Sequence, residues 1–270
     1  MSIYSDEYER MTGMPAPKQA EQLDRLFDEI SQKHLLPPKG QQAVDCGFVA
    51  HTFNDRKINP AIYAYYDWVL SNEFNVDEIS ELPANIIGHE FVCANIFATD
   101  WPQPVTVNPW QIKDVLQMKV ATGKAVVIEN NGVFIWLLHR HPTWPLILQS
   151  GNDFNATYLK VMKALAGEIK LAYLGDLDTS GIRIADQLTT YLGNEDFQNL
   201  AVIQSPSQVA QWLAGYGKVD DSDRIHVSVE LHNQFWKEES YLLMVNQQFV
   251  EQEQLIDSYE TLIPEWLGQA

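Results

Sequence analysis

Residues 171–188, LAYLGDLDTSGIRIADQL, constrain the fold of this chain more than any other stretch. A short apolar run from Leu171 to Leu174 is typical of a buried strand, and a helical pattern of apolar residues follows from Ile182. Between them stand two aspartates, Asp176 and Asp178. Carboxylates at the carboxyl end of a strand lie where open α/β sheets bind ligands, and closely spaced oxygen ligands suit a hard cation such as Mg²⁺. The pattern favours a metal site, with an ordinary turn as the alternative, because Asp, Thr, Ser and Gly are also turn residues.

The strand-then-helix pattern recurs through the second half of the chain. We expect strands at 125–128, 146–148, 171–174, 200–203 and 225–229, and an acidic, amphipathic helical tail from Glu238 to Leu267. This alternation indicates βαβ units, and therefore an α/β fold with a mostly parallel sheet and flanking helices. Three prolines within 100–109 mark a boundary. We therefore predict a smaller, mainly helical N-terminal lobe over residues 1–104 and the α/β domain over residues 105–270.

Charge and composition limit the classes of function. The chain has 36 acidic and 18 basic residues and a net charge of −18, which argues against tight, autonomous nucleic-acid binding. The stretch from Lys119 to Asp186 is nearly balanced, so the acidity lies outside the segment that holds the two aspartates. No apolar run is long enough to cross a bilayer and the N-terminus is polar, so we expect a cytoplasmic protein that makes no membrane contact. Cys46 and Cys93 lack metal-ligand spacing and are expected to be buried free thiols.

Polar groups follow three of the predicted strands. They are Glu129, the pair Ser150-Gly151, and the two aspartates. Strand ends in a parallel sheet point the same way, so Glu129 is expected to lie within reach of Asp176 and Asp178. A glutamate beside a metal-holding pair suits phosphodiester chemistry, in which it shuttles a proton while a cation neutralises the phosphoryl oxygens. Burial beside two aspartates should raise the pKa of Glu129 and keep it partly protonated near neutral pH.

The chain from about residue 106 to 255 resembles the Toprim domain of type II topoisomerases, DnaG-type primases and several nucleases. The similarity is carried by ENNGVF at 129–134, GDLDTSGIRIA at 175–185 and FVEQEQL at 249–255. These pieces are closest to Toprim proteins typified by the Wadjet JetD nuclease subunit, themselves similar to topoisomerase VI A subunits. The resemblance implies a Rossmann-like Toprim fold. It also implies that Glu129 is the general acid/base and that Asp176 and Asp178, with Glu129, bind Mg²⁺ or Mn²⁺.

Five further residues are candidates for the same site. Glu251 and Glu253 match the EQE string and would support the metal site, with a solvated acidic helix face as the alternative. Arg183, Ser150 and Lys160 are candidate substrate-binding residues. For Arg183 the alternative is a structural ion pair with a nearby aspartate, and for Ser150 it is a tight turn.

The resemblance implies a metal-dependent Toprim nuclease that cleaves DNA phosphodiesters as a subunit of a bacterial defence or plasmid-restriction complex. The partners that the resemblance implies are DNA and protein subunits of SMC-like type. The sequence departs from JetD-like chains in that only about 105 residues precede the Toprim part, with no recognisable winged helix. The acidity of this N-terminal lobe favours a protein partner over a phosphate backbone.

Two other functions fit parts of the sequence. AYLGDLDTS also resembles the motif of haloacid-dehalogenase-type phosphatases, with Asp176 as nucleophile, Asp178 as acid/base and Lys218 recruited to the site. Against this, Ser180 stands where Thr or Val is expected, and two predicted strands precede a motif that normally opens the domain. The second alternative is a non-catalytic module that binds DNA or a protein partner.

Overall fold

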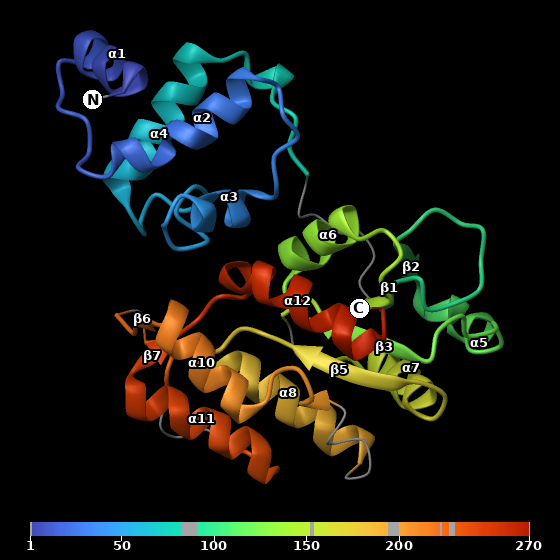
Figure 1. Ribbon diagram of the computed structural model, residues 1–270. Coiled ribbons are helices and arrows are strands. Elements are labelled where there is room, and N and C mark those ends of the chain that lie inside the picture. Colours follow the sequence, from blue (N-terminus) through green and yellow to red (C-terminus); the bar gives the residue numbers. More distant parts are fainter. Residues whose placement is uncertain are drawn as a thin grey trace. The chain divides into compact units, whose positions relative to one another are not determined.

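The computed structural model describes residues 2–82, 91–151, 154–193, 200–221, 223–226 and 230–269. The chain forms two compact units, Met1–Ala84 and Asn85–Ala270, each with its own apolar core. Figure 1 shows the first unit in blue to cyan and the second in green to red. The division falls about twenty residues before the predicted one at 104/105, because strand β1 (Phe91–Ala94) pairs within the sheet of the second unit.

The first unit is built from four helices in its described residues. They are α1 (Ile3–Thr12), α2 (Asp24–Ser31), α3 (Lys39–Asp45) and α4 (Pro60–Glu73), with short 3₁₀ turns η1 (Ala20–Leu23) and η2 (Val76–Glu78). Helix α4 starts where the side chain of Asn59 accepts from the backbone N–H of Ile62 and Pro60 takes the first position. Its aromatic residues fill the core: Tyr66 stacks on Phe53 with ring centroids 4.2 Å apart. The aromatic helix is therefore a core element of this unit.

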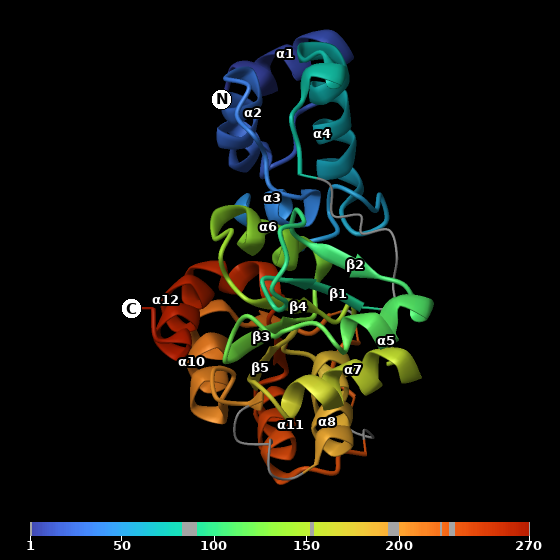
Figure 2. The ribbon, with the colours of Figure 1, turned by 90° about the vertical axis from the view of Figure 1, so that its right-hand side faces the viewer.

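The second unit contains a five-stranded sheet in the order β2-β1-β4-β3-β5, which Figure 2 shows from top to bottom. The remaining strands are β2 (Val105–Val107), β3 (Lys124–Ile128), β4 (Leu146–Leu148) and β5 (Lys170–Leu174). β3 is parallel to β4 and to β5, whereas β1 is antiparallel to both β2 and β4. Four strands therefore run in one direction and only β1 is reversed, so the sheet is mostly parallel as predicted. After the lysines that begin β3 and β5, the residues of β3, β4 and β5 are apolar and buried, as parallel strands covered by helices must be.

Helices cover both faces of this sheet. Figure 1 shows α6 (Asn131–Arg140) and α12 (Ile256–Leu267) on one face, and α7 (Ala156–Ala166) and α8 (Thr179–Leu192) on the other. Helices α10 (Pro206–Tyr216) and α11 (Gln234–Asn246) pack against each other, and α11 packs against α8. A short pair, η3 (Pro109–Gln111) and α5 (Ile112–Val115), follows β2.

Three predicted elements differ in the structure. The apolar run 200–203 is not a strand: it starts in helical conformation and continues as an irregular segment in which Ala201 and Ile203 are buried and Val202 is exposed. Of the predicted strand 225–229, residues 225 and 226 are irregular and residues 227–229 lie outside the described residues. The acidic tail is not one continuous helix, because α11 ends at Asn246 and the next residue, Gln247, lies in the left-handed region, with φ 50°.

Between the tail helices the chain forms a short strand. β7 (Gln248–Phe249) pairs antiparallel with β6 (Lys218–Val219), and the 3₁₀ turn η4 (Gln252–Leu255) leads into α12. This interruption brings residues 250–253 to the end of β5, where Leu177 and Val250 form an antiparallel bridge.

Two expectations from composition can be compared with the structure. Cys46 and Cys93 are both buried and free, as predicted. In the described ranges no helix combines the length and the apolar character that a membrane crossing requires.

Candidate functional site

Strand pairing places Glu129 beside the acidic loop that follows β5. Ile128 is paired with Leu174, and the next backbone N–H, that of Glu129, donates to the carbonyl oxygen of Leu174 at 3.1 Å. Oε2 of Glu129 accepts from the backbone N–H of Asp176 at 3.2 Å and from the hydroxyl of Tyr173 at 3.0 Å. The predicted proximity of Glu129 and Asp176 is confirmed, and it follows from the parallel pairing of β3 with β5.

Two glycines leave the space that Glu129 occupies. A Cβ atom on Gly175 would lie 2.3 Å from Oε2 of Glu129. A Cβ atom on Gly181 would lie 2.2 Å from the carbonyl oxygen of Asp176 and 3.0 Å from the same Oε2. The small residues of the GDLDTSG string therefore allow the backbone to close around the buried carboxyl.

The two aspartates have different local roles. Asp178 caps α8: its backbone is extended and its Oδ1 accepts from the N–H of Gly181 at 2.9 Å. Oδ1 of Asp176 accepts from the backbone N–H of Gln252 at 2.8 Å. The loop is thus both a helix-capping turn and an acidic pair, so capping by itself does not explain Asp176.

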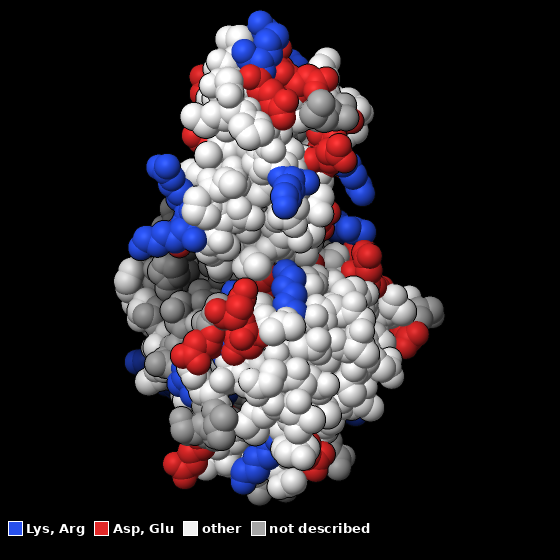
Figure 3. All heavy atoms as spheres, turned by 90° about the vertical axis from the view of Figure 1, so that its left-hand side faces the viewer, with Lys and Arg blue, Asp and Glu red and all other residues white. Residues whose placement is uncertain are grey.

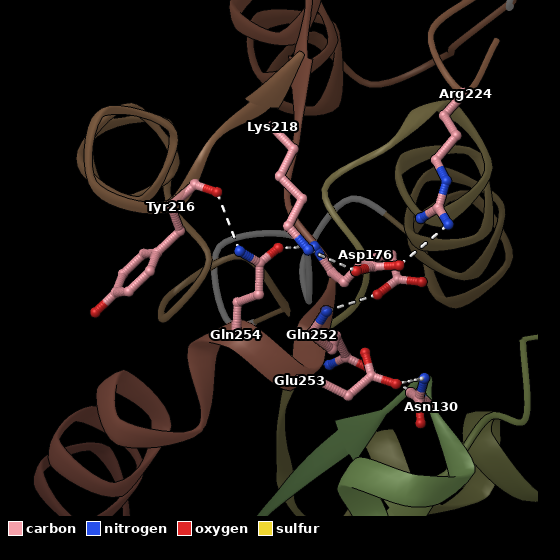
Figure 4. A network of polar contacts seen from close by, with 9 residues as sticks. Asn130, Asp176, Tyr216, Lys218, Arg224, Gln252, Glu253 and Gln254 are labelled. Atoms are coloured by element: carbon pink, nitrogen blue, oxygen red, sulfur yellow. Dashed lines mark hydrogen bonds and ion pairs between the residues drawn. The ribbon is translucent and has the colours of Figure 1, made fainter. Parts of the chain in front are cut away.

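The EQE segment closes over this loop, as Figure 4 shows. Gln252, which is fully buried, accepts from the backbone N–H of Asn130 at 2.9 Å through its Oε1 and donates to the hydroxyl of Tyr259 at 3.3 Å. Glu253 accepts from Nδ2 of Asn130 at 3.0 Å. Glu251 and Glu253 are only 2% and 5% exposed, which excludes the solvated helix face as an explanation for them.

Burial and mutual repulsion raise the pKa values of the carboxyls. Burial, and next the charge of Asp178, raise the pKa of Glu129 to about 7, which agrees with the shift expected from the sequence. Burial raises the pKa of Glu253 to about 7, with Glu251 adding to the rise. The pKa of Asp176 lies well above its usual value because of burial and then Glu129, and burial also raises the pKa of Asp178. A shared buried region of acids is characteristic of functional sites.

The donor chemistry of this acidic cluster, defined as Glu129, Asp176, Asp178 and Glu253, suits a divalent cation. Mg²⁺ and Mn²⁺ prefer carboxylate oxygens, and a cation would relieve the repulsion that raises these pKa values. In the ranges that the structure describes, no three His, Cys, Asp or Glu side chains already stand as a metal-holding group. Each cluster member instead accepts a hydrogen bond from an N–H group. Each of these bonds occupies one oxygen of its carboxyl group, and the second oxygen of each group is the one that would bind a cation.

The predicted substrate-binding residues lie on neighbouring elements. Ser150 follows β4 with φ 78°, next to Gly151 with φ 66°, so the tight turn offered as its alternative is present. Arg183 is partly buried on α8 and Lys160 is exposed on α7. The hydrogen bonds described above for the acidic cluster come from the side chains of Tyr173 and Asn130 and from the backbone N–H groups of residues 176, 181 and 252.

Sequence reasoning missed several residues that hold the site. The backbone N–H of Asn130, after β3, donates to the Gln252 side chain, and the backbone N–H of Gln252 donates to Asp176, after β5. Asn130 and Gln252 both lie inside the strings that carry the Toprim resemblance. Glu251 forms ion pairs with Lys218 and Arg224. Lys218 was a candidate only for the phosphatase alternative. Arg224 lies in an irregular segment, and no sequence motif indicated it.

Comparison with known proteins finds one family model that matches part of this site. Residues 105–200 match a family model described as "Protein of unknown function C-terminus (DUF2399)". The match runs from β2 past α8 and includes Glu129, Asp176 and Asp178, but ends before the EQE segment. No curated protein matches the chain.

Proposed function

We propose that this protein is a metal-dependent Toprim-type nuclease that hydrolyses DNA phosphodiesters. The observation that carries the proposal is the buried acidic cluster, in which Glu129 at the end of β3 contacts the Asp176 backbone at the end of β5. The motif resemblance of residues 129–134, 175–185 and 249–255 supports the same assignment.

Glu129 acts as the general acid/base. With a pKa of about 7, both protonation states are populated at neutral pH, so the carboxyl can accept a proton from the attacking water or donate one to the leaving oxygen. The Tyr173 hydroxyl and the Asp176 backbone N–H both donate to Oε2, which orients the side chain toward the loop. The two glycines keep that position accessible to the carboxyl.

The remaining cluster members are assigned to cation binding. Asp176, Asp178 and Glu253, together with Glu129, supply the carboxylate oxygens that would hold Mg²⁺ or Mn²⁺. When bound, such a cation neutralises charge on the phosphoryl oxygens and orients the nucleophile. Both oxygens of Glu251 bond to cationic side chains, so we give Glu251 no part in binding the metal.

The biological setting of the proposal rests on the resemblance to JetD-like Toprim proteins. In this setting the protein is a subunit of a bacterial defence or plasmid-restriction complex that binds DNA together with SMC-like protein subunits. On the face shown in Figure 3, acidic and basic side chains are interspersed and do not form a broad basic surface. With a net charge of −18, DNA contact would depend on a few local cations and on partner subunits.

The first test compares phosphodiester and phosphomonoester hydrolysis. We expect nicking of DNA with Mn²⁺, and a loss of at least a hundredfold in Glu129→Gln, which keeps the side-chain shape but cannot exchange the proton. The wild-type pH–rate profile should show an ionisation near 7 that is absent from any residual activity of this variant.

The same assay distinguishes the phosphatase alternative. Hydrolysis of a small phosphomonoester that survives in Glu129→Gln but is lost in Asp176→Asn would contradict the nuclease proposal and favour the phosphatase. Absence of both activities, with partner binding retained, would favour the non-catalytic module.

A further inference from the structure

Two cationic side chains meet on one buried carboxylate beside the acidic cluster. Nζ of Lys218, on β6, lies 3.1 Å from Oε2 of Glu251, and a guanidinium nitrogen of Arg224 lies 3.1 Å from Oε1. The Glu251 side chain is 3% exposed, while those of Lys218 and Arg224 are 26% and 23% exposed. Figure 4 shows that Lys218 and Arg224 come from different segments of the chain. The anion is therefore enclosed, and the cations retain access to solvent.

Several contacts fix the two cations in place. The guanidinium of Arg224 lies 4.5 Å from the ring centroid of Phe249, the residue paired with Lys218 across β6 and β7. The Arg224 backbone N–H donates to Oδ1 of Asp220 at 3.0 Å, and its carbonyl accepts from the N–H of Thr179 at 3.2 Å. Arg224 is thereby tied to the first residue of α8, next to Asp178.

Arg224 also acts on the acidic cluster. Its guanidinium and the ammonium of Lys218 meet on the carboxylate of Glu251 at the edge of that cluster. Burial raises the pKa of Asp178, and the charge of Arg224 opposes that rise, so the guanidinium acts across the same region. An anionic group bound between the cations and the cluster would be stabilised from the cationic side.

We propose that Lys218 and Arg224, held by Glu251, bind a phosphate of the nucleic-acid backbone next to the acidic cluster. This inference rests on the proposed nuclease function and names the residues that position its substrate. Arg224 offers a planar guanidinium with several donors for the phosphate oxygens, and Lys218 offers a compact charge. Glu251 is then a positioning residue for these cations, whereas the sequence had suggested a metal ligand.

The test is the salt dependence of oligonucleotide binding by the full chain. Fluorescence anisotropy is measured with a labelled DNA duplex in EDTA, so that no cleavage occurs and no metal is required. We expect Lys218→Gln and Arg224→Gln each to weaken binding about tenfold and to reduce the slope of log K against log [salt] by about one. The matched control is Lys237→Gln, an exposed lysine on α11, which should keep the wild-type slope.

Charge-preserving variants separate phosphate binding from structural support. Lys218→Arg and Arg224→Lys should keep the wild-type salt slope, and thermal melting should show that all variants are folded. Equal slopes in the wild type and both Gln variants, or no duplex binding by the wild type, would overturn the inference. It would also be overturned if Arg224→Lys lost as much slope as Arg224→Gln.

Two further arms identify the ligand and separate this inference from the proposed function. Inorganic phosphate as competitor should displace the duplex only at millimolar or higher concentrations, and displacement at micromolar concentrations would contradict backbone binding. Glu129→Gln should bind the duplex like the wild type while losing cleavage. Undiminished cleavage by Glu129→Gln would refute the proposed function, whereas unchanged slopes in the Gln variants would refute only the phosphate contact.

Discussion

At the residue scale, the site depends on a few side chains that are buried although they are polar. Glu129 is buried at 6% exposure, and the loop after β5 closes on it only because residues 175 and 181 lack a Cβ atom. Glu129 and Asp176 were predictable from the sequence, because strand ends of a parallel sheet converge on one edge. Arg224 was not predictable, because its position follows from backbone contacts with Asp220 and Thr179 that no local pattern reveals.

Gly175→Ala tests the close approach at Glu129. The added Cβ would meet Oε2 of Glu129 at 2.3 Å and Tyr173 at 2.8 Å, so we expect a loss of about 1–3 kcal/mol in the free energy of unfolding. Nuclease activity should fall at least tenfold. The measurement is urea unfolding, with Gly215→Ala on α10 as the control, because nothing lies within 4 Å of that Cβ. The control should gain up to about 1 kcal/mol, and equal effects at the two positions would contradict this account.

Glu239 tests the effect of a buried acid outside the cluster. It is fully buried on α11, accepts from Gln204 at 3.3 Å, and its Oε1 has no hydrogen-bond partner in the described part of the chain. Burial raises its pKa well above the usual value. Because the folded-state pKa lies above the unfolded one, its contribution to stability is full below about pH 4.5 and is lost as pH rises toward the folded value.

Glu239→Gln should therefore stabilise the protein at neutral and higher pH. We expect a gain of about 1–3 kcal/mol at pH 8, a smaller difference at pH 5, and a flatter pH dependence than in the wild type. Urea unfolding of both proteins between pH 5 and 8 measures this. A difference that does not change with pH would show that Glu239 is ionised in the folded state.

At the element scale, the regular strands and helices were easier to predict than the segments that complete the site. β3, β4 and β5 match predicted strands, because a short apolar run bounded by polar residues is typical of a buried strand. The segment 200–203 is equally apolar but forms no strand, and the residue after it, Gln204, accepts from the Gly175 N–H at 3.0 Å. The break at Gln247 in the acidic tail was missed, since helical periodicity continues on both sides of it.

Asp178→Asn separates the capping of α8 from the chemistry. Asn is as good an N-cap as Asp, so the free energy of unfolding should change by about 0.5 kcal/mol or less. Activity should fall at least a hundredfold, because a carboxylate of the acidic cluster is lost. Asp178→Ala should lose activity to the same extent and also about 1 kcal/mol of stability. Activity retained in the Asn variant would show that residue 178 acts only as a cap.

At the scale of the whole molecule, all the proposed chemistry lies in one unit. The acidic cluster, the two cations that Glu251 holds and every contact described for them belong to Asn85–Ala270, while Met1–Ala84 has a separate aromatic core. The mostly parallel sheet and the mainly helical first lobe followed from the sequence pattern. The boundary did not, because Pro102 and Pro104 lie in the connection between two paired strands, β1 and β2, and Pro109 begins η3 directly after β2.

The most direct measurement is nicking of supercoiled plasmid in three reactions. They contain the wild-type protein with Mn²⁺, the wild-type protein with Mn²⁺ removed by EDTA, and the Asp176→Asn variant with Mn²⁺. Asp176 is the cluster member whose Oδ1 bonds to the Gln252 backbone, and Asn retains an acceptor for that bond. We predict nicking by the wild type with Mn²⁺, none in EDTA, and a loss of at least a hundredfold in the folded variant. Nicking that persists at the wild-type rate in EDTA or in Asp176→Asn would contradict the account.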